Sequence, residues 1–546
     1  MRAKYATILL PVAIIIACGS GNDNFNTDGG KDGSGNGDGG PTFGDTGGGD
    51  GSGTIATCAD AANAKSYVGC DYWPTVTGNN VWSIFDFAVV VANASTQPAQ
   101  ITITGPNNTN QTGNVAPGQL QKFYLPWVTS LKGPDTDNCG NATAMSGSVV
   151  AKGGAYHLVS SVPVSVYQFN ALEYKPAGGP NGKNWSTCPG DTVCQTQFQP
   201  IGCFSFSNDA SLLLPSTAMT NNYRVMGQKG WSEQGFGPIM GPSFAVTATA
   251  NGTVVTVKTS TTSQVLAGGG IPTTNGTGQF TVALNAGDVA EVVGQIGDQN
   301  DFSGSLVTAQ DASHPIQVIT SLPCINQPEG TAACDHIEES VFPAETLGQH
   351  YFVTVPTSPG GTPIGHIVRI FGNVDGTTLT YSPSKPAGCP STLNAGQVAD
   401  CGQVTTDFEV KGNNAFGVFS GMLGGTLVDP VNGDGDPSQS FMIAVEQYRT
   451  AYIFLAPNDY DISYVDIVGP TGANVQVDGA GVTGFKAIGA SGFGVARYKL
   501  GSGNSGAHTL TSDKPVGIQV VGYGQYTSYQ YPGGSDLIAI APPPVK

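Results

Sequence analysis

The stretch SDKPVGIQV, residues 512–520, is a polar turn followed by a proline and a run of alternating residues. Three further stretches share this pattern: SSVPVSVYQ (160–168), ASHPIQVI (312–319) and GNNAFGVF (412–419). Pro315, Ala415 and Pro515 occupy equivalent places at 100-residue intervals. A proline that opens a run of period two is typical of a strand with one buried face. The repetition therefore predicts about four copies of one β unit.

Two more features recur upstream of these stretches. One is a tight turn with a glycine, found at 115–119, 284–288 and 393–397. The other is a pair of apolar runs joined through Asn-Gly, Asp-Gly or another glycine turn, which favours a hairpin. We expect hairpins at 244–257, 366–381 and 464–477, with a counterpart formed by 87–91 and 99–103. No long helical period is evident, so the sequence predicts an all-β fold of tandem β-sandwich-like units.

The expected domain organisation has six parts. They are a lipoprotein signal peptide (1–17), a disordered Gly/Asp/Asn-rich linker (18–55), β unit 1 with a cysteine-bearing insertion (56–203), β unit 2 (204–334), β unit 3 (335–437) and β unit 4 (438–546). The linker contains almost nothing that could be buried, which is the composition of a solvated tether.

The first residues predict export and lipid attachment. Arg2 and Lys4 precede an apolar run at 8–16, which is too short to span a bilayer. Ile15-Ile16-Ala17-Cys18 fits the site that a lipoprotein signal peptidase cuts, so we expect acylation of Cys18 and anchoring to a bacterial outer membrane. Such a protein could also face the cell surface. The alternative is an ordinary cleaved signal in which Cys18 is incidental.

Charge and cysteine content limit the classes of protein to which the chain can belong. A net charge of −18 opposes nucleic-acid binding. Ten cysteines after Cys18 predict about five disulfides in an exported chain. Spacing favours Cys58 with Cys70, Cys324 with Cys334 and Cys389 with Cys401, whereas it leaves the pairing open for Cys139, Cys188, Cys194 and Cys203. No C-x-x-C pair occurs, which disfavours zinc and thioredoxin-type chemistry.

Two acidic stretches are candidate cation sites. Asn432, Asp434 and Asp436 alternate like the first ligands of a calcium loop, but Pro437 and Ile443 stand where an EF-hand needs glycine and glutamate. The stretch is therefore either a weak calcium site or a polar linker. The second candidate, residues 335–339, offers three acids and a histidine for a divalent cation, or is simply a solvated turn.

Catalytic motifs are missing from the sequence. It contains no G-x-S-x-G, no H-E-x-x-H, no P-loop and no dinucleotide fingerprint after a strand. We therefore predict a protein without catalytic residues. A hydrolase remains as an alternative only if Asp335, Glu338 and Asp436, from different units, converge in the fold.

The tyrosine-rich run at 522–531 has two interpretations. Its rings could stack on a sugar or a peptide, since tyrosines among small residues are typical of adaptable binding loops. The preferred interpretation is packing against the sheet, because the run continues directly from the strand after Pro515.

Several landmarks together resemble one known family. They are GCDYWPTV (69–76), FDFAVVVAN (85–93), CDHIEE (334–339), GDPSQS (435–440) and YQYPGG (529–534). They are similar, in content and order, to the IgGFc-binding protein N-terminal domain family. The resemblance implies an exported or lipid-anchored protein. The lipid-attachment site, the linker, the repeats and the missing catalytic motifs favour a non-catalytic binding or adhesion module with a protein or glycan ligand. A structural envelope component that self-associates is the alternative, and no immunoglobulin-contact residues can be identified.

Overall fold

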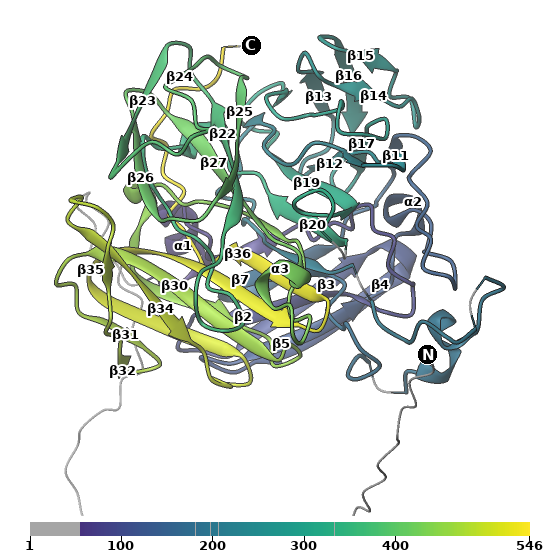
Figure 1. Cartoon of the computed structure of the whole chain (residues 1–546), viewed down its shortest axis with the longest axis horizontal. Coiled ribbons are helices and arrows are strands. Elements are labelled where there is room, and N and C mark those ends of the chain that lie inside the picture. The colour runs from purple at the N-terminus through teal and green to yellow at the C-terminus, as the bar shows by residue number, and fades with distance from the viewer. Residues whose placement is uncertain (1–54, 181, 197, 206, 332–333, 546) are drawn as a thin grey trace, which may run out of the picture. The chain divides into compact units, whose positions relative to one another are not determined.

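The computed structural model describes residues 55–180, 182–196, 198–205, 207–331 and 334–545. Nearly all regular structure is strand, as the all-β prediction required (Figure 1). The helical elements are short: α1 (Cys58–Ala64), α2 (Thr129–Lys132), α3 (Gly425–Val428), η1 (Pro106–Asn108), η2 (Trp185–Thr187), η3 (Pro189–Asp191), η4 (Ala344–Thr346) and η5 (Val445–Gln447). Within the described residues, none of these helices has the length and apolarity to span a bilayer.

The strands fall into four units. The first unit contains β1 (Gly69–Tyr72), β2 (Phe87–Asn93), β3 (Ala99–Gly105), β4 (Thr109–Val115), β5 (Leu120–Leu125), β7 (His157–Asn170) and β8 (Asp209–Leu212). The second contains β6 (Val149–Ala151), β9 (Asn222–Arg224), β12 (Ser243–Ala248), β13 (Thr253–Lys258), β16 (Gln279–Leu284), β17 (Val289–Val293), β18 (Leu306–Ala309), β19 (Ile316–Ile325) and β20 (Asp335–Ser340). Two small ribbons accompany it: β10 (Trp231–Glu233) with β11 (Gly237–Met240), and β14 (Gln264–Val265) with β15 (Thr274–Asn275).

The other two units follow the same plan. The third contains β21 (His350–Val353), β22 (His366–Gly372), β23 (Thr377–Ser382), β24 (Thr392–Leu393), β25 (Val398–Val404), β26 (Phe408–Gly412), β27 (Phe416–Met422) and β28 (Gln439–Phe441). The fourth contains β29 (Arg449–Leu455), β30 (Ile462–Pro470), β31 (Val475–Val477), β32 (Ala480–Gly481), β33 (Lys486–Ala487), β34 (Phe493–Lys499), β35 (Ala507–Gly524) and β36 (Thr527–Pro532).

The repeated turn-and-proline stretch lies where the chain passes between two sheet layers. In the second unit β18 belongs to the sheet β16-β13-β18-β9, and β19 belongs to β20-β19-β12-β17-β6. The third unit is divided in the same way between β26 and β27. In the first and fourth units the two halves are continuous as β7 and β35. The two halves of each of these strands nevertheless pair with different strands. In all four units, therefore, the repeated stretch marks the point at which the chain passes from one sheet layer to the other.

The predicted hairpins are wrong. β12 and β13 lie in different sheets, and so do β22 and β23. Strands β30 and β31 pair with opposite halves of β35, while β2 and β3 pair with opposite halves of β7. The glycine turns therefore connect the two layers of a sandwich. Alternation shows that each strand buries one face, but it does not show whether successive strands share a sheet.

One strand from each unit contributes to a central ring. β8 contacts β20 and β36, and β28 contacts the same two strands. Each of these strands also pairs with the last long strand of its own unit: β8 with β7, β20 with β19, β28 with β27 and β36 with β35. Three of them follow the predicted unit boundaries at 204, 335 and 438 but hydrogen-bond to the preceding unit.

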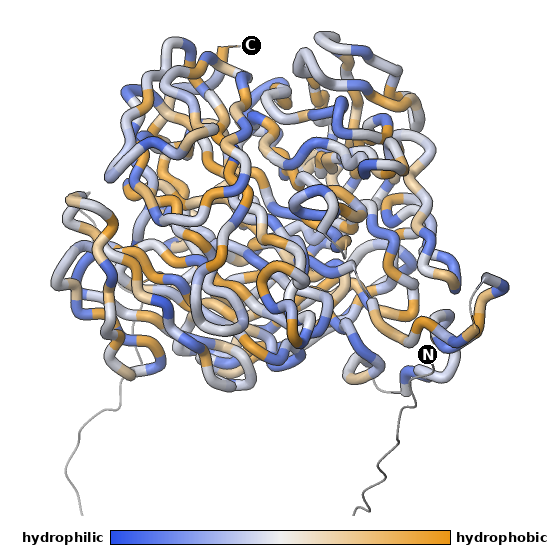
Figure 2. Tube along the Cα trace, in the orientation of Figure 1, coloured by the Kyte–Doolittle hydropathy of each residue, from blue (hydrophilic) through white to orange (hydrophobic). Residues whose placement is uncertain are grey.

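Apolar packing extends from one unit to the next. All seven residues of β2 are buried. Phe87 and Val89 face the core of the first unit, whereas Ala88 and Val90 join a cluster with Tyr452 and other residues of the fourth unit. Fully burying a valine or phenylalanine side chain contributes about 1.5–3 kcal/mol to the free energy of unfolding. Both faces of β2 are therefore buried, which explains its apolar run at residues 87–92. Figure 2 shows hydrophobic and hydrophilic segments along the trace of the chain.

Five disulfides hold the loops. The structure contains the three pairs favoured by spacing, which join Cys58 to Cys70, Cys324 to Cys334 and Cys389 to Cys401. The four cysteines left open are paired as Cys139 with Cys194 and Cys188 with Cys203. These two bridges hold the insertion between β7 and β8. Cys18 lies outside the described residues, as do the predicted signal peptide and most of the linker.

Candidate functional site

Asp209 is a buried acid at the centre of the ring. Its Oδ2 accepts hydrogen bonds from the backbone N–H of Glu338 and of Gln439, each at 3.0 Å. Its Oδ1 accepts from the N–H of Ala210 at 2.8 Å. Burial raises the pKa of Asp209 well above its ordinary value, and the backbone donors partly oppose this shift. One carboxyl group therefore joins strands of three units, which is a structural task.

Glu338 is a second buried acid with its own set of donors. Its carboxylate accepts hydrogen bonds from the hydroxyl of Thr77 and from the amides of Gln168 and Asn170. His336 lies on the same strand, with its Nε2 3.8 Å from Glu338 Oε2. All of these side chains except that of the histidine are hydrogen-bonded to this carboxylate, so Glu338 is held by the first unit rather than presented to a ligand.

The fold brings Asp335 and Asp436 close together, as the hydrolase alternative requires. Asp335 Oδ1 accepts hydrogen bonds from the backbone N–H of Asn208 and of His336. Burial, and then the negative charge of Asp436, raise the pKa of Asp335 well above its ordinary value. Both acids are fully buried, and neither lines the cleft between the second and third units that is described below. This arrangement offers no open surface to a substrate and gives the hydrolase alternative no support.

The three predicted calcium ligands have different surroundings. The amide of Asn432 is exposed and donates a hydrogen bond to Asp429 at 3.0 Å. Asp434 is half-buried, and burial raises its pKa. Asp436 is fully buried beside Asp335. Among the described residues no group of three or more His, Cys, Asp or Glu side chains is placed to hold a metal ion. Calcium therefore remains a prediction of the sequence.

The tyrosine-rich run packs its rings, in line with the preferred interpretation. Tyr523, Tyr529 and Tyr531 are buried, and the rings of the last two stack with centroids 5.1 Å apart. Tyr531 also contacts the ring of Tyr167 in the first unit at 4.7 Å. Only Tyr526, at the turn between β35 and β36, reaches the surface, with 36% of its area exposed. The run therefore holds the first and fourth units together.

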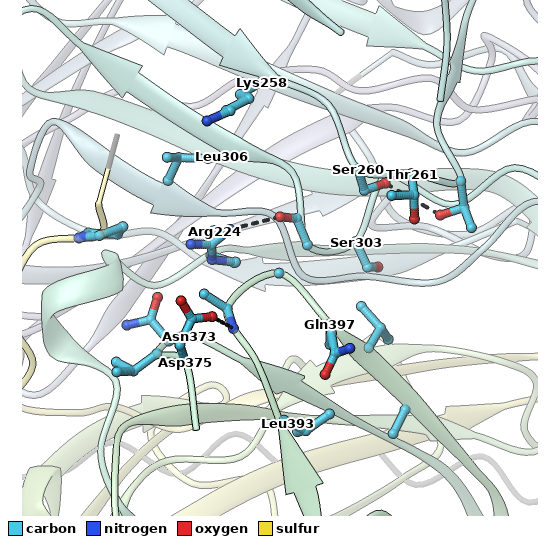
Figure 3. A pocket seen from close by; sticks show the side chains of 18 of the residues that line it. Arg224, Lys258, Ser260, Thr261, Ser303, Leu306, Asn373, Asp375, Leu393 and Gln397 are labelled. Atoms are coloured by element: carbon cyan, nitrogen blue, oxygen red, sulfur yellow. Dashed lines mark hydrogen bonds between the residues drawn. The ribbon is translucent and has the colours of Figure 1, made fainter. Parts of the chain in front are cut away.

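A cleft of about 1110 Å³ with several polar side chains in its lining lies between the second and third units. One wall carries Lys258 at the end of β13 and the serines and threonines of residues 259–262. The other carries Asn373 and Asp375 from the turn between β22 and β23, and Gln397 from the recurrent glycine turn. Figure 3 shows Arg224 between these two walls. The C-terminal residues 542–545 also line the cleft.

Two buried arginines form part of its lining. Arg224 donates from Nη1 to the carbonyl oxygen of Gly304 at 2.9 Å, and burial lowers its pKa. Arg369 donates to the carbonyl oxygen of Gly227 and pairs with Asp301. Within the described part of the chain, the Nε of each arginine has no hydrogen-bond partner. Both Nε atoms are themselves buried, so they do not face the open part of the cleft.

The walls meet at a close glycine contact. A Cβ added to Gly304 would lie 2.0 Å from the carbonyl oxygen of Gly396, and Gly304 has a φ of +88°. Any larger residue there would separate the two units. Sequence reasoning missed this cleft because its two walls come from turns of different units, at 258–262 and 373–397, that are far apart in the sequence. The only local signal is the polar run Lys258-Thr259-Ser260-Thr261-Thr262 directly after a strand.

Comparison with known proteins identifies a family and a structural similarity. The sequence profile described as "IgGFc binding protein" matches residues 209–522. No curated protein sequence gives a significant match. Among solved structures, the chain is similar to an anti-sigma factor domain-containing protein from Clostridium clariflavum. The identity is 11%, the alignment covers 59% of this chain and 83% of that one, and the TM-score is 0.12.

Proposed function

The chain belongs to the IgGFc-binding protein family, and on that premise we propose that it is a non-catalytic binding module of the bacterial cell envelope. Its family is one of binding-type surface proteins. Five disulfides together with this family indicate an exported protein. Lipid attachment at Cys18 would anchor the β units to the outer membrane, with the Gly/Asp-rich linker as a tether.

The cleft between the second and third units is the proposed ligand site, and its lining is the observation that carries the proposal. Arg224, Lys258 and Arg369 bring three cations to one cleft of a chain with a net charge of −18. Asp301, Asp375 and Asp400 balance them, so the cleft as a whole is close to neutral. Hydroxyls, amides and paired charges in one cleft recognise hydroxyl-rich or carboxylate-bearing ligands. A glycan, or a peptide segment with an acidic side chain, fits this chemistry.

Binding can be tested with a labelled full-length chain on an array of neutral and acidic glycans, with immunoglobulin Fc as a separate protein probe. The variants Lys258→Gln and Gln397→Ala change exposed cleft residues that carry no core packing. Each should weaken binding about tenfold, the effect of losing one hydrogen bond of about 1.4 kcal/mol. Lys499→Gln, an exposed change on β34 of the fourth unit, is the matched control. Equal binding by all variants would move the ligand site elsewhere.

The alternative of a self-associating envelope component predicts a different solution behaviour. A binding module should sediment as a single small species at all concentrations. A structural component should form larger assemblies as the concentration rises, whether or not the cleft is mutated. Sedimentation velocity on the same preparations therefore separates the two functions before any ligand is known.

A further inference from the structure

Lys183, Asp86 and Glu173 form a compact triad in the first unit, and none of them lines the cleft. Lys183 Nζ lies 2.5 Å from Asp86 Oδ2 and 2.7 Å from Glu173 Oε1. The lysine side chain is 9% exposed and that of Glu173 is fully buried. Every other described lysine with an ion pair faces a single carboxylate. The triad therefore combines an amine, a carboxyl group and a second acid in contact with the amine.

The backbone positions the two acids. Asp86 immediately precedes β2, and Glu173 follows the end of β7, the antiparallel neighbour of β2. The N–H of Leu172 donates to the carbonyl oxygen of Asp86 at 3.1 Å. Glu173 Oε2 accepts a hydrogen bond from the N–H of Asp86 at 2.9 Å. The sheet thus holds the carboxyl group of Glu173 against the residue that carries the second carboxyl group.

The insertion between β7 and β8 supplies the lysine and closes the triad. The ring of Trp185 lies over Lys183 with Nζ 4.3 Å from its centroid, and Phe85 packs against that ring at 5.3 Å. On another side Gly179 approaches so closely that a Cβ there would lie 2.4 Å from Glu173 Oε1. These groups shield Lys183 and Glu173 from water, while the side chain of Asp86 is 21% exposed.

We propose that Lys183 and Asp86 form an intramolecular isopeptide bond, with Glu173 as the proton-transfer group. The lysine nitrogen attacks Cγ of Asp86, an N–C bond forms and one C–O bond of the carboxyl group breaks. Glu173 takes the proton from the attacking nitrogen and returns it to the departing oxygen, which leaves as water. Amine plus carboxylic acid gives amide plus water, so the reaction needs no oxidant, reductant or further reactant.

Two physical arguments support this reaction over a permanent ion pair. Fixed contact between two reacting groups raises their effective concentration to about 10⁵–10⁸ M. This effect offsets the unfavourable equilibrium of amide formation from a free amine and a free carboxylic acid in water. Two carboxylates against one ammonium would leave a negative charge in a mostly buried site, which is costly. Burial, with the charge of Asp86, raises the pKa of Glu173 to about 7, so this acid can both hold and accept a proton near neutral pH.

The bond is tested by mass spectrometry of the exported full chain after complete reduction of its disulfides. The wild type should be lighter by one water molecule than expected from its own composition, and Glu173→Gln and Lys183→Arg should not lose that water. Lys122→Arg is the matched control, because Lys122 pairs with Asp459 alone and that change should leave the water loss intact. Comparison within one set of preparations cancels any processing of the N-terminus.

Proteolytic mapping of the wild type decides the case even if a variant fails to fold. The expected result is a branched fragment in which the peptide carrying Asp86 is joined to the peptide carrying Lys183. Recovery of Lys183 in a linear peptide that reacts with an amine reagent would overturn the proposal. Loss of water with a reactive Lys183 would also overturn it, since that result indicates a cyclic imide at an acid or amide residue instead.

Discussion

Glu291 on β17 makes stability depend on pH in a way that one substitution can isolate. Its Oε1 accepts hydrogen bonds from the N–H of Gly78 at 2.8 Å and from the hydroxyl of Ser243 at 3.3 Å. Its Oε2 has no hydrogen-bond partner among the described residues. Burial raises the pKa of Glu291 from 4.5 to about 8, and the two donors only partly oppose that shift. The acid is thus protonated in the folded chain at neutral pH.

The sign of the effect follows from proton binding. The folded chain holds this proton more tightly than the unfolded chain, so its stabilising contribution is complete below pH 4.5 and is lost as the pH rises through about 8. The whole shift corresponds to about 5 kcal/mol, of which about 4 kcal/mol falls between pH 5 and pH 9. Glu291→Gln removes the titrating group. The free energy of unfolding of this variant relative to the wild type should therefore rise by about 4 kcal/mol over that interval.

Urea unfolding at pH 5, 7 and 9, with the disulfides intact, measures this difference. Other titrating groups are common to both chains and cancel in the comparison. Glu329→Gln, at an exposed glutamate, is the matched control and should track the wild type at every pH. A stability difference between wild type and Glu291→Gln that stays constant from pH 5 to pH 9 would refute the assignment of a raised pKa to this residue.

Three further predictions concern the disulfides, the ring and the calcium loop. Replacing Cys139 and Cys194 by serine opens a 55-residue loop and should lower the free energy of unfolding by about 4 kcal/mol, whereas opening the ten-residue Cys324–Cys334 loop should lower it by about 3 kcal/mol. If urea unfolding gave the larger loss for the shorter loop, the chain-entropy argument would be contradicted. Asp209→Ala leaves three backbone N–H groups without their acceptor and should lower the free energy of unfolding by at least about 3 kcal/mol. A decrease below about 1 kcal/mol would show that the Asp209 carboxyl group does not hold the strands of the three units together. Because Asp436 is buried, millimolar calcium and then EDTA should leave the melting temperature unchanged, and a reversible rise would instead support the calcium prediction at 432–436.

The failed hairpin prediction shows where sequence periodicity stops being informative. Residues 244–257 contain two good strands and an Asn-Gly turn, and all three features are present as β12, β13 and the turn at Gly252. Gly252 has a φ of +72°, as a tight turn requires. The turn does not determine whether the second strand returns beside the first or crosses to the facing sheet. That choice depends on β17, β18 and β19, which come later in the chain.

The same limit applies to the acids. The sequence distinguishes 335–339 and 432–436 as polar stretches, but only the fold shows that Asp335 and Asp436 lie close together. The sequence does not show that both are buried, because a single acid in a strand is usually solvent-exposed. Burial here results from the ring of β8, β20, β28 and β36, whose strands come from four different repeats.

The sequence alone determined the all-β class and the three disulfides of short spacing, because each of these rests on residues within about a dozen positions of one another. It also determined the repeated units, because short stretches of the same local pattern recur along the chain. Tertiary structure alone decided how the four remaining cysteines pair, which strands share a sheet, where the cleft opens and which acids meet Lys183. Asp86 and Lys183 are almost a hundred residues apart and lie in contact only because β2 pairs with β7 and the disulfide-bonded insertion folds over that edge. Contacts between residues so far apart in the sequence leave no local periodic pattern, because they depend on which buried faces pack together.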